Sequence, residues 1–121
     1  MFLKKLFPVN LNQLIKLING SILYDSLPGL ELSYAFASDL MSDALRWYKE
    51  NMILITGLAT IQTIRTAELA GISCIVIARG KKVTDEMMEL AVESHISIVT
   101  SPMSVFEISG KLYQNGIKPL Y

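Results

Sequence analysis

The fold of this chain is decided between Met52 and Ala78, where the sequence reads MILITGLATIQTIRTAELAGISCIVIA. The stretch begins and ends with an apolar run, and neither run alternates with polar residues. Strands of this kind are buried on both faces, as they are in parallel sheets. Between them the spacing of apolar residues predicts a helix from Thr60 to Ala70, ended by Gly71. A strand–helix–strand unit with buried strands predicts a right-handed crossover and a parallel sheet.

Segments on both sides extend this pattern. In chain order they are a helix from Asn10 to Gly20, strands at Ser21–Tyr24 and Leu32–Ser38, a helix at about Leu40–Tyr48, a helix from Thr84 to Ser94, an apolar run at 96–99 and a helix at Ser104–Tyr113. We therefore expect an α/β fold of three layers, with a mainly parallel sheet of about five strands flanked by helices. Residues 1–121 form a single domain on this interpretation. Leu69 and Phe106 are expected to pack inward.

Composition limits the function. Eleven basic and eleven acidic residues give a net charge of zero, so no global field attracts nucleic acid or an anionic membrane. The chain is 51% hydrophobic and only 18% charged, which predicts that a second copy covers part of the surface as a homodimer. No run approaches the roughly 18 apolar residues of a membrane span, and no signal-peptide core is evident, so we expect a cytoplasmic protein. Cys74 lies in an apolar run and is expected to be buried.

Polar residues follow the predicted strands. In open parallel sheets ligands bind beyond the carboxyl ends of the strands. The residues at those ends are Ser38, Asp39, Thr56, Gly57, Arg79, Gly80, Thr100 and Ser101. They supply hydroxyls, a carboxylate, a guanidinium and backbone that a ligand can approach closely. We expect them to form a ligand-binding edge with Arg79 as its main anchor. The alternative is that these are ordinary polar loops, with Arg79 paired to Asp39 or Glu31.

The helix after Thr56 has a polar face with Gln62 and Arg65. Either residue could face a ligand or a second subunit. The alternative is a solvated face on which Arg65 and Glu68 pair at the surface.

Motifs for catalysis are missing from the sequence. The segment GLATIQTI has one glycine and no lysine, so it is not a Walker loop, and no GxGxxG fingerprint is present. His95, the only histidine, falls where a helix leads into a strand, away from the expected ligand edge. We therefore predict no enzymatic activity, no metal site and no cofactor.

Four segments, taken in this order and spacing, resemble a DRTGG domain. They are ASDLMSDAL (37–45), ITGLATIQTIRTAELAGI (55–72), IVIARGKK (75–82) and ISIVTSPMSVFEISGKLY (96–113). The closest resemblance is to stand-alone members encoded near hydrogenase and electron-transfer genes. Similar domains precede the catalytic part of HPr kinase/phosphorylase and lie between the CBS domains of certain pyrophosphatases.

The resemblance implies a fold like that of the N-terminal domains of HPr kinase and of Mur ligases. It also implies dimerisation and a regulatory role, with a nucleotide-like ligand in some relatives. At one point this chain departs from the family pattern: Leu58–Ala59–Thr60 stand where many members have a second glycine and a charged Asp–Arg pair.

The first hypothesis for function is a non-catalytic regulatory or ligand-sensing domain that binds an anionic or nucleotide-like ligand. The alternative is an interaction module that docks on a redox or hydrogenase-type enzyme, or on a kinase, without a small ligand. The third hypothesis is an enzyme whose active site matches no familiar motif.

Overall fold

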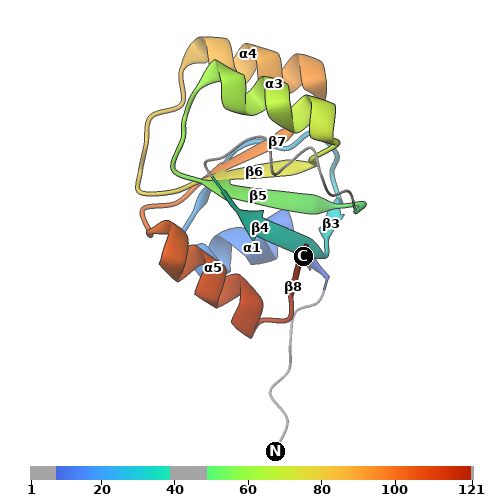
Figure 1. Cartoon of the computed structure of the whole chain (residues 1–121), viewed down its shortest axis with the longest axis vertical. Coiled ribbons are helices and arrows are strands. Elements are labelled where there is room, and N and C mark those ends of the chain that lie inside the picture. The colour runs from blue at the N-terminus through green and yellow to red at the C-terminus, as the bar shows by residue number, and fades with distance from the viewer. Residues whose placement is uncertain (1–7, 39–48, 121) are drawn as a thin grey trace, which may run out of the picture.

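The computed structural model describes residues 8–38 and 49–120. Figure 1 shows a sheet between two layers of helices, as the sequence predicts. In chain order the elements are β1 Val9–Asn10, α1 Leu11–Ile18, β2 Ser21–Tyr24, β3 Glu31–Leu32, β4 Tyr34–Ala37, β5 Met52–Thr56, α3 Ile61–Ala70, β6 Cys74–Ile77, α4 Asp85–Ser94, β7 Ser97–Thr100, α5 Val105–Gln114 and β8 Lys118–Pro119. Six strands form this sheet in the order β2-β7-β6-β5-β4-β8, and β1 and β3 form a separate antiparallel pair. The predicted helix at 40–48 lies outside the described residues.

The sheet is mainly parallel. The pairs β8–β4, β4–β5, β5–β6 and β6–β7 are all parallel. The edge strand β2 is antiparallel to β7, with Ser21 opposite Thr100. The connection from α1 is only Asn19–Gly20, so β2 starts at the edge of the sheet where β7 ends. β8 brings the sheet to six strands, one more than the sequence indicates.

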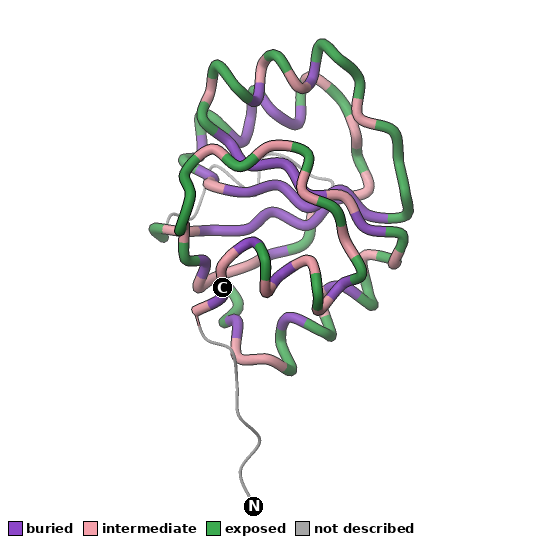
Figure 2. Tube along the Cα trace, turned by 180° about the vertical axis from the view of Figure 1, so that it is seen from behind, coloured by how far each residue is buried: buried purple, intermediate pink, exposed green. Residues whose placement is uncertain are grey.

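Helices α3 and α4 cover one face of the sheet, and α1 and α5 cover the other (Figure 1). The middle strand β5 contributes side chains to the hydrophobic cores on both faces of the sheet, because successive side chains of a strand point to opposite faces. Met52 and Leu54 join the cluster under α3 and α4, whereas Ile53 and Ile55 join the cluster over α1 and α5. Every residue of β5 is buried, and Figure 2 shows burial concentrated on the central strands. This confirms the prediction of strands buried on both faces.

Polar caps begin the helices where the sequence predicts. The side chains of Thr60, Thr84 and Ser104 each accept a hydrogen bond from the N–H three residues later. Asn10 forms a capping box with Gln13, in which each side chain bonds the backbone of the other. These caps satisfy N–H groups that a helix end otherwise leaves without partners.

Two packing predictions are wrong. Leu69 is 77% exposed and Phe106 is 87% exposed. On α3 the core-facing row is Ile64, Ala67 and Ala70, and Leu69 lies about 100° around the helix from Ala70. On α5 the buried residues are Ile108 and Leu112, and Phe106 lies on the opposite side. Within residues 8–38 and 49–120, no helix is long and apolar enough to cross a membrane.

Candidate functional site

The strand ends meet at one edge of the sheet. Backbone hydrogen bonds tie neighbouring ends together: Ser38 N–H donates to Ile55 O (3.1 Å), Ala78 N–H to Thr56 O (2.9 Å) and Ser101 N–H to Ile77 O (2.9 Å). The structure therefore brings Ser38, Thr56, Gly57, Arg79, Gly80, Thr100 and Ser101 to a common edge, while Asp39 lies outside the described residues. We call this the carboxyl edge.

Arg79 occupies a tight turn at this edge. Its φ is 62° and that of Gly80 is 63°, so both central residues of the turn are left-handed, as in a type I′ turn. The Lys81 N–H closes the turn on Ala78 O at 3.5 Å. Two backbone hydrogen bonds join this turn to the loop that follows β7. Arg79 N–H donates to Met103 O and Gly80 N–H donates to Ser101 O, both at 2.8 Å. A left-handed arginine costs roughly 1–2 kcal/mol relative to ordinary backbone, so the surroundings hold it there.

The Arg79 side chain lies over Gly57. A Cβ atom on Gly57 would be 3.6 Å from Arg79 Nη2 and 3.7 Å from its Nε. The guanidinium is therefore beside the backbone that joins β5 to α3. Arg79 is exposed, and no carboxylate among the described residues forms an ion pair with it. The alternative pairing with Glu31 is not present, and Asp39 is outside the described range.

Two of the predicted hydroxyls serve the fold. Ser101 is 1% exposed, and its Oγ donates to Ile18 O at 2.6 Å and accepts from Met103 N–H at 3.1 Å. Thr56 is fully buried, and its Oγ1 accepts from Leu58 N–H at 3.0 Å. These hydroxyls shape the loops at the carboxyl edge, whereas the partly exposed Ser38 and Thr100 lie nearer to solvent.

The start of α3 also lies at this edge. The Leu58–Thr60 loop is held by Thr63, whose Oγ1 donates to Leu58 O at 2.8 Å. Gln62 is exposed in the first turn and its amide donates to Thr66 Oγ1 at 3.3 Å. Arg65 is exposed about one turn further along the helix, and so further from the edge. The first turn of α3 thus belongs to the same surface as Arg79, and Arg65 borders it.

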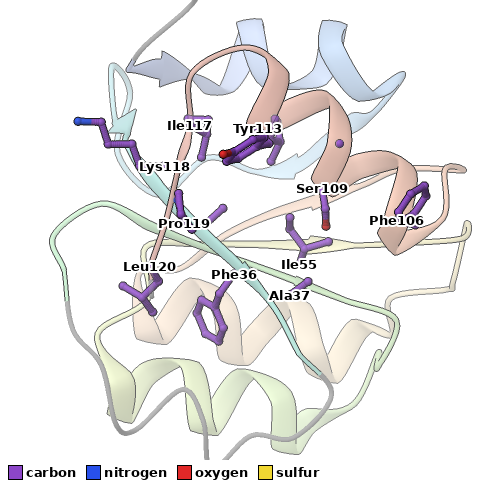
Figure 3. Close-up of a pocket in the computed structure, with 13 residues that line it drawn as sticks. Phe36, Ala37, Ile55, Phe106, Ser109, Tyr113, Ile117, Lys118, Pro119 and Leu120 are labelled. Atoms are coloured by element: carbon purple, nitrogen blue, oxygen red, sulfur yellow. The ribbon is translucent and has the colours of Figure 1, made fainter.

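A groove that sequence reasoning did not locate lies between α5 and the strands β4 and β8. Its volume is about 470 Å³ and its walls are mostly apolar. Figure 3 shows Ala37 and Ile55 at its floor, with Phe106, Ser109 and Tyr113 on α5. The apolar residues of the last helix were the one feature of the sequence that could have indicated this groove. The wall opposite α5 includes β8, a strand that the sequence does not predict.

The remaining reactive groups lie away from both surfaces or inside the core. His95 caps the end of α4 with a φ of 57° and is exposed, as expected of a histidine in a turn. Cys74 is fully buried. Burial, with a further contribution from the charge of Asp25, raises the pKa of its thiol to about 12. Among the described residues no three His, Cys, Asp or Glu side chains are grouped so that they could hold a metal ion.

Fold and site together define a three-layer α/β domain whose polar carboxyl edge presents an arginine beside a glycine. The model of the DRTGG domain family matches residues 13–114. The chain belongs to this family.

The fold is similar to that of a solved regulatory region over almost the whole chain. The solved structure is the crystal structure of the CBS and DRTGG domains of the regulatory region of Clostridium perfringens pyrophosphatase, complexed with its activator diadenosine tetraphosphate. The TM-score is 0.76 at 15% sequence identity, over 97% of this chain and 53% of the other. This chain therefore spans about half the length of that regulatory region. No curated protein shows significant similarity to this chain.

Proposed function

We propose that this chain is a non-catalytic regulatory domain, cytoplasmic and homodimeric, that senses an anionic, nucleotide-like ligand at the carboxyl edge. The observation that carries the proposal is Arg79, an exposed arginine in a left-handed turn fixed by two backbone hydrogen bonds. Strained backbone persists where the surroundings hold it, and it is concentrated at functional sites. An arginine side chain offers a permanent charge and a planar fork that suits phosphate or carboxylate.

The neighbourhood of Arg79 fits an anion. Lys81 and Lys82 follow in the same exposed loop, so three cations are close together in a chain with no net charge. Gly57 has no side chain beside the guanidinium, so the planar group of Arg79 can lie close to the β5–α3 loop. Support also comes from the similar regulatory region of a pyrophosphatase, which was crystallised with a dinucleotide activator.

The test is a thermal-shift titration with four named probes: diadenosine tetraphosphate, ATP, AMP and inorganic phosphate. A probe present at 100 times its dissociation constant stabilises the folded chain by about 2.7 kcal/mol. For a domain of this size we expect the melting temperature to rise by roughly 8–15 °C. No shift with any of the four probes at millimolar concentration would count against the ligand site.

Variants at the turn make the test specific. Arg79→Ala should weaken binding about tenfold or more, because a hydrogen bond to a charged group contributes about 1.5–3 kcal/mol. Lys81→Ala removes the same charge from the same turn and should weaken binding less. Arg79→Gly also removes the guanidinium, but it relieves the left-handed strain, so the unliganded protein should melt at the same or a higher temperature. Equal losses from Arg79→Ala and Lys81→Ala would indicate diffuse attraction instead of a site built on Arg79.

The second candidate function is an interaction module that docks on a redox or hydrogenase-type enzyme or on a kinase. The apolar groove beside α5 favours it, because grooves of this kind mark protein contacts. The two functions differ in the titration: a pure docking module shows no shift with any of the four probes.

A further inference from the structure

Helix α5 exposes a stripe of two aromatic residues with a glycine between them. Phe106 is 87% exposed and Tyr113 is 70% exposed. Together with Gly110 they occupy positions i, i+4 and i+7 of the helix, and so lie on one face. Figure 3 shows Phe106 and Tyr113 towards opposite ends of α5, bordering the apolar groove. Large aromatic residues are enriched in protein interfaces, so this stripe is suited to a contact with another protein chain.

The pattern of the stripe is self-complementary. Phe106 and Tyr113 have their midpoint at Ser109–Gly110, and the charged neighbours Glu107 and Lys111 are centred on Ser109. When two copies of a helix pair antiparallel about a two-fold axis, residues equally far from the axis face each other. An axis near Ser109–Gly110 therefore places Phe106 opposite the partner's Tyr113. The same axis places Glu107 opposite the partner's Lys111, on one flank of the stripe.

Ser109 and Gly110, the residues nearest to such a two-fold axis, allow the two helices to approach each other closely. A Cβ atom on Gly110 would meet nothing within 4 Å, so this position leaves a notch between the two aromatic side chains. The Ser109 hydroxyl donates to Val105 O at 2.7 Å within its own helix. The hydroxyl donor of Ser109 would therefore keep its partner when Ser109 is buried in an interface. This matters because buried polar groups are rarely left without a hydrogen bond.

The aromatic residues supply much of the area that a dimer needs. A phenylalanine or tyrosine buries roughly 150–250 Å², so two of each contribute roughly 600–1,000 Å². A stable interface buries about 1,200–2,000 Å² in total. The walls of the adjoining 470 Å³ groove, formed by β4 and β8, lie next to the stripe and can supply the remainder.

We propose that a second copy of this chain covers the α5 stripe, through an antiparallel α5–α5 contact with its two-fold axis near Ser109–Gly110. This interface is separate from the carboxyl-edge turn at Arg79. The proposal rests on the homodimer of the proposed function, for which it locates the contact, and none of its α5 residues belongs to the ligand site.

Sedimentation equilibrium on the full chain is the first experiment. At 10–100 μM, roughly the range in which a micromolar dimer forms, we expect twice the 13.5 kDa chain mass. Phe106→Ser and Tyr113→Ser should each weaken the dimer at least tenfold. Leu69→Ser is the matched control, because it removes another exposed apolar side chain from α3, and it should leave the mass unchanged. A monomer at 100 μM would overturn the proposal and leave the stripe to a different protein.

A charge reversal tests the antiparallel register. Glu107→Lys places two lysines opposite each other across the axis and should weaken the dimer several-fold at low salt. In the double variant Glu107→Lys, Lys111→Glu, positions 107 and 111 again carry opposite charges across the interface, with the two charges exchanged. Its dissociation constant should return to within about threefold of the wild type. All these positions are at the helix surface, and circular dichroism checks that each variant is folded.

Cross-linking at the axis provides an independent readout. Ser109→Cys should form a disulfide with its own copy under mild oxidation, whereas the native Cys74 is buried and should not. A dimer that keeps its affinity in Phe106→Ser, or that fails to cross-link through position 109, contradicts this interface.

Discussion

Substitution of Gly20 by alanine tests how tightly the carboxyl edge is packed. Gly20 joins α1 to β2, and a Cβ atom built on it would lie 2.8 Å from the carbonyl oxygen of Thr100. The same atom would be 3.3 Å from Ile18 Cγ1 and 3.4 Å from Val99 Cγ1. The closest neighbour is backbone within a paired strand, so it cannot turn aside as a flexible side chain would. Strand β2 or β7 must shift to admit the methyl group.

The expected loss of stability follows from two opposing effects. Overpacking of this kind typically costs about 1–3 kcal/mol. Alanine also restricts the unfolded chain, which stabilises the folded state by about 0.4–1 kcal/mol where the backbone is compatible. Gly20 is not among the residues with positive φ, so this gain applies. We expect a net loss of about 1–2 kcal/mol and a melting temperature lower by roughly 3–10 °C.

Gly57→Ala is the matched control for this experiment. It too has no positive φ, but its nearest neighbour would be the tip of Arg79 at 3.6 Å, an ordinary contact with a flexible side chain. This variant should be neutral or stabilised by up to about 1 kcal/mol. Urea denaturation of both variants, with equal m-values, gives the comparison. If Gly20→Ala proves as stable as Gly57→Ala, the contact between Gly20 and Thr100 does not constrain this edge.

Two further predictions concern the core and the first helix. The folded Cys74 thiol keeps its proton to about pH 12, whereas its ordinary pKa is 9.0, so its contribution to stability is complete below pH 9 and is lost as the pH rises towards 12. The free energy of unfolding should fall by about 1.4 kcal/mol per pH unit above pH 9 relative to Cys74→Ala, and parallel profiles of the two proteins would contradict this. Asn10→Ala removes the side-chain cap of α1, which is the Asn10 Oδ1 that accepts a hydrogen bond from Gln13 N–H, and should cost about 1 kcal/mol. The neighbouring Asn12→Ala, at an exposed position of α1, should cost much less in the same denaturation assay.

The sequence predicts most of the fold because its strongest signals are local. Apolar runs without alternation occur only where both faces of a strand are covered, and the caps at Thr60, Thr84 and Ser104 lie next to the helices that they start. β8 could not be found in this way, since two residues that include Pro119 carry no periodicity. Proline is tolerated there because β8 is an edge strand. The prediction for Phe106 is wrong because hydrophobicity alone does not tell which side of a helix faces the core.

The candidate site was predictable only as a position in the chain. That the strand ends meet follows from the parallel topology, so Ser38, Thr56, Arg79 and Thr100 could be placed at one edge before the structure was known. The direction of each side chain could not, because it depends on contacts distant in sequence. The Ser101 hydroxyl turns to Ile18 O, 83 residues away, and nothing near Ser101 in the sequence indicates that partner.

The left-handed backbone of Arg79 shows how these long-range contacts shape the edge. An arginine in an ordinary loop would lose side-chain and backbone freedom on binding an anion, and that loss would weaken binding. Here the backbone is already fixed, by bonds to Ser101 O and Met103 O from the loop that leads into α5. That loop is fixed in turn by Ser101, whose hydroxyl ties it to the end of α1. Part of the ordering that an anion would otherwise have to impose is therefore already complete when the domain folds.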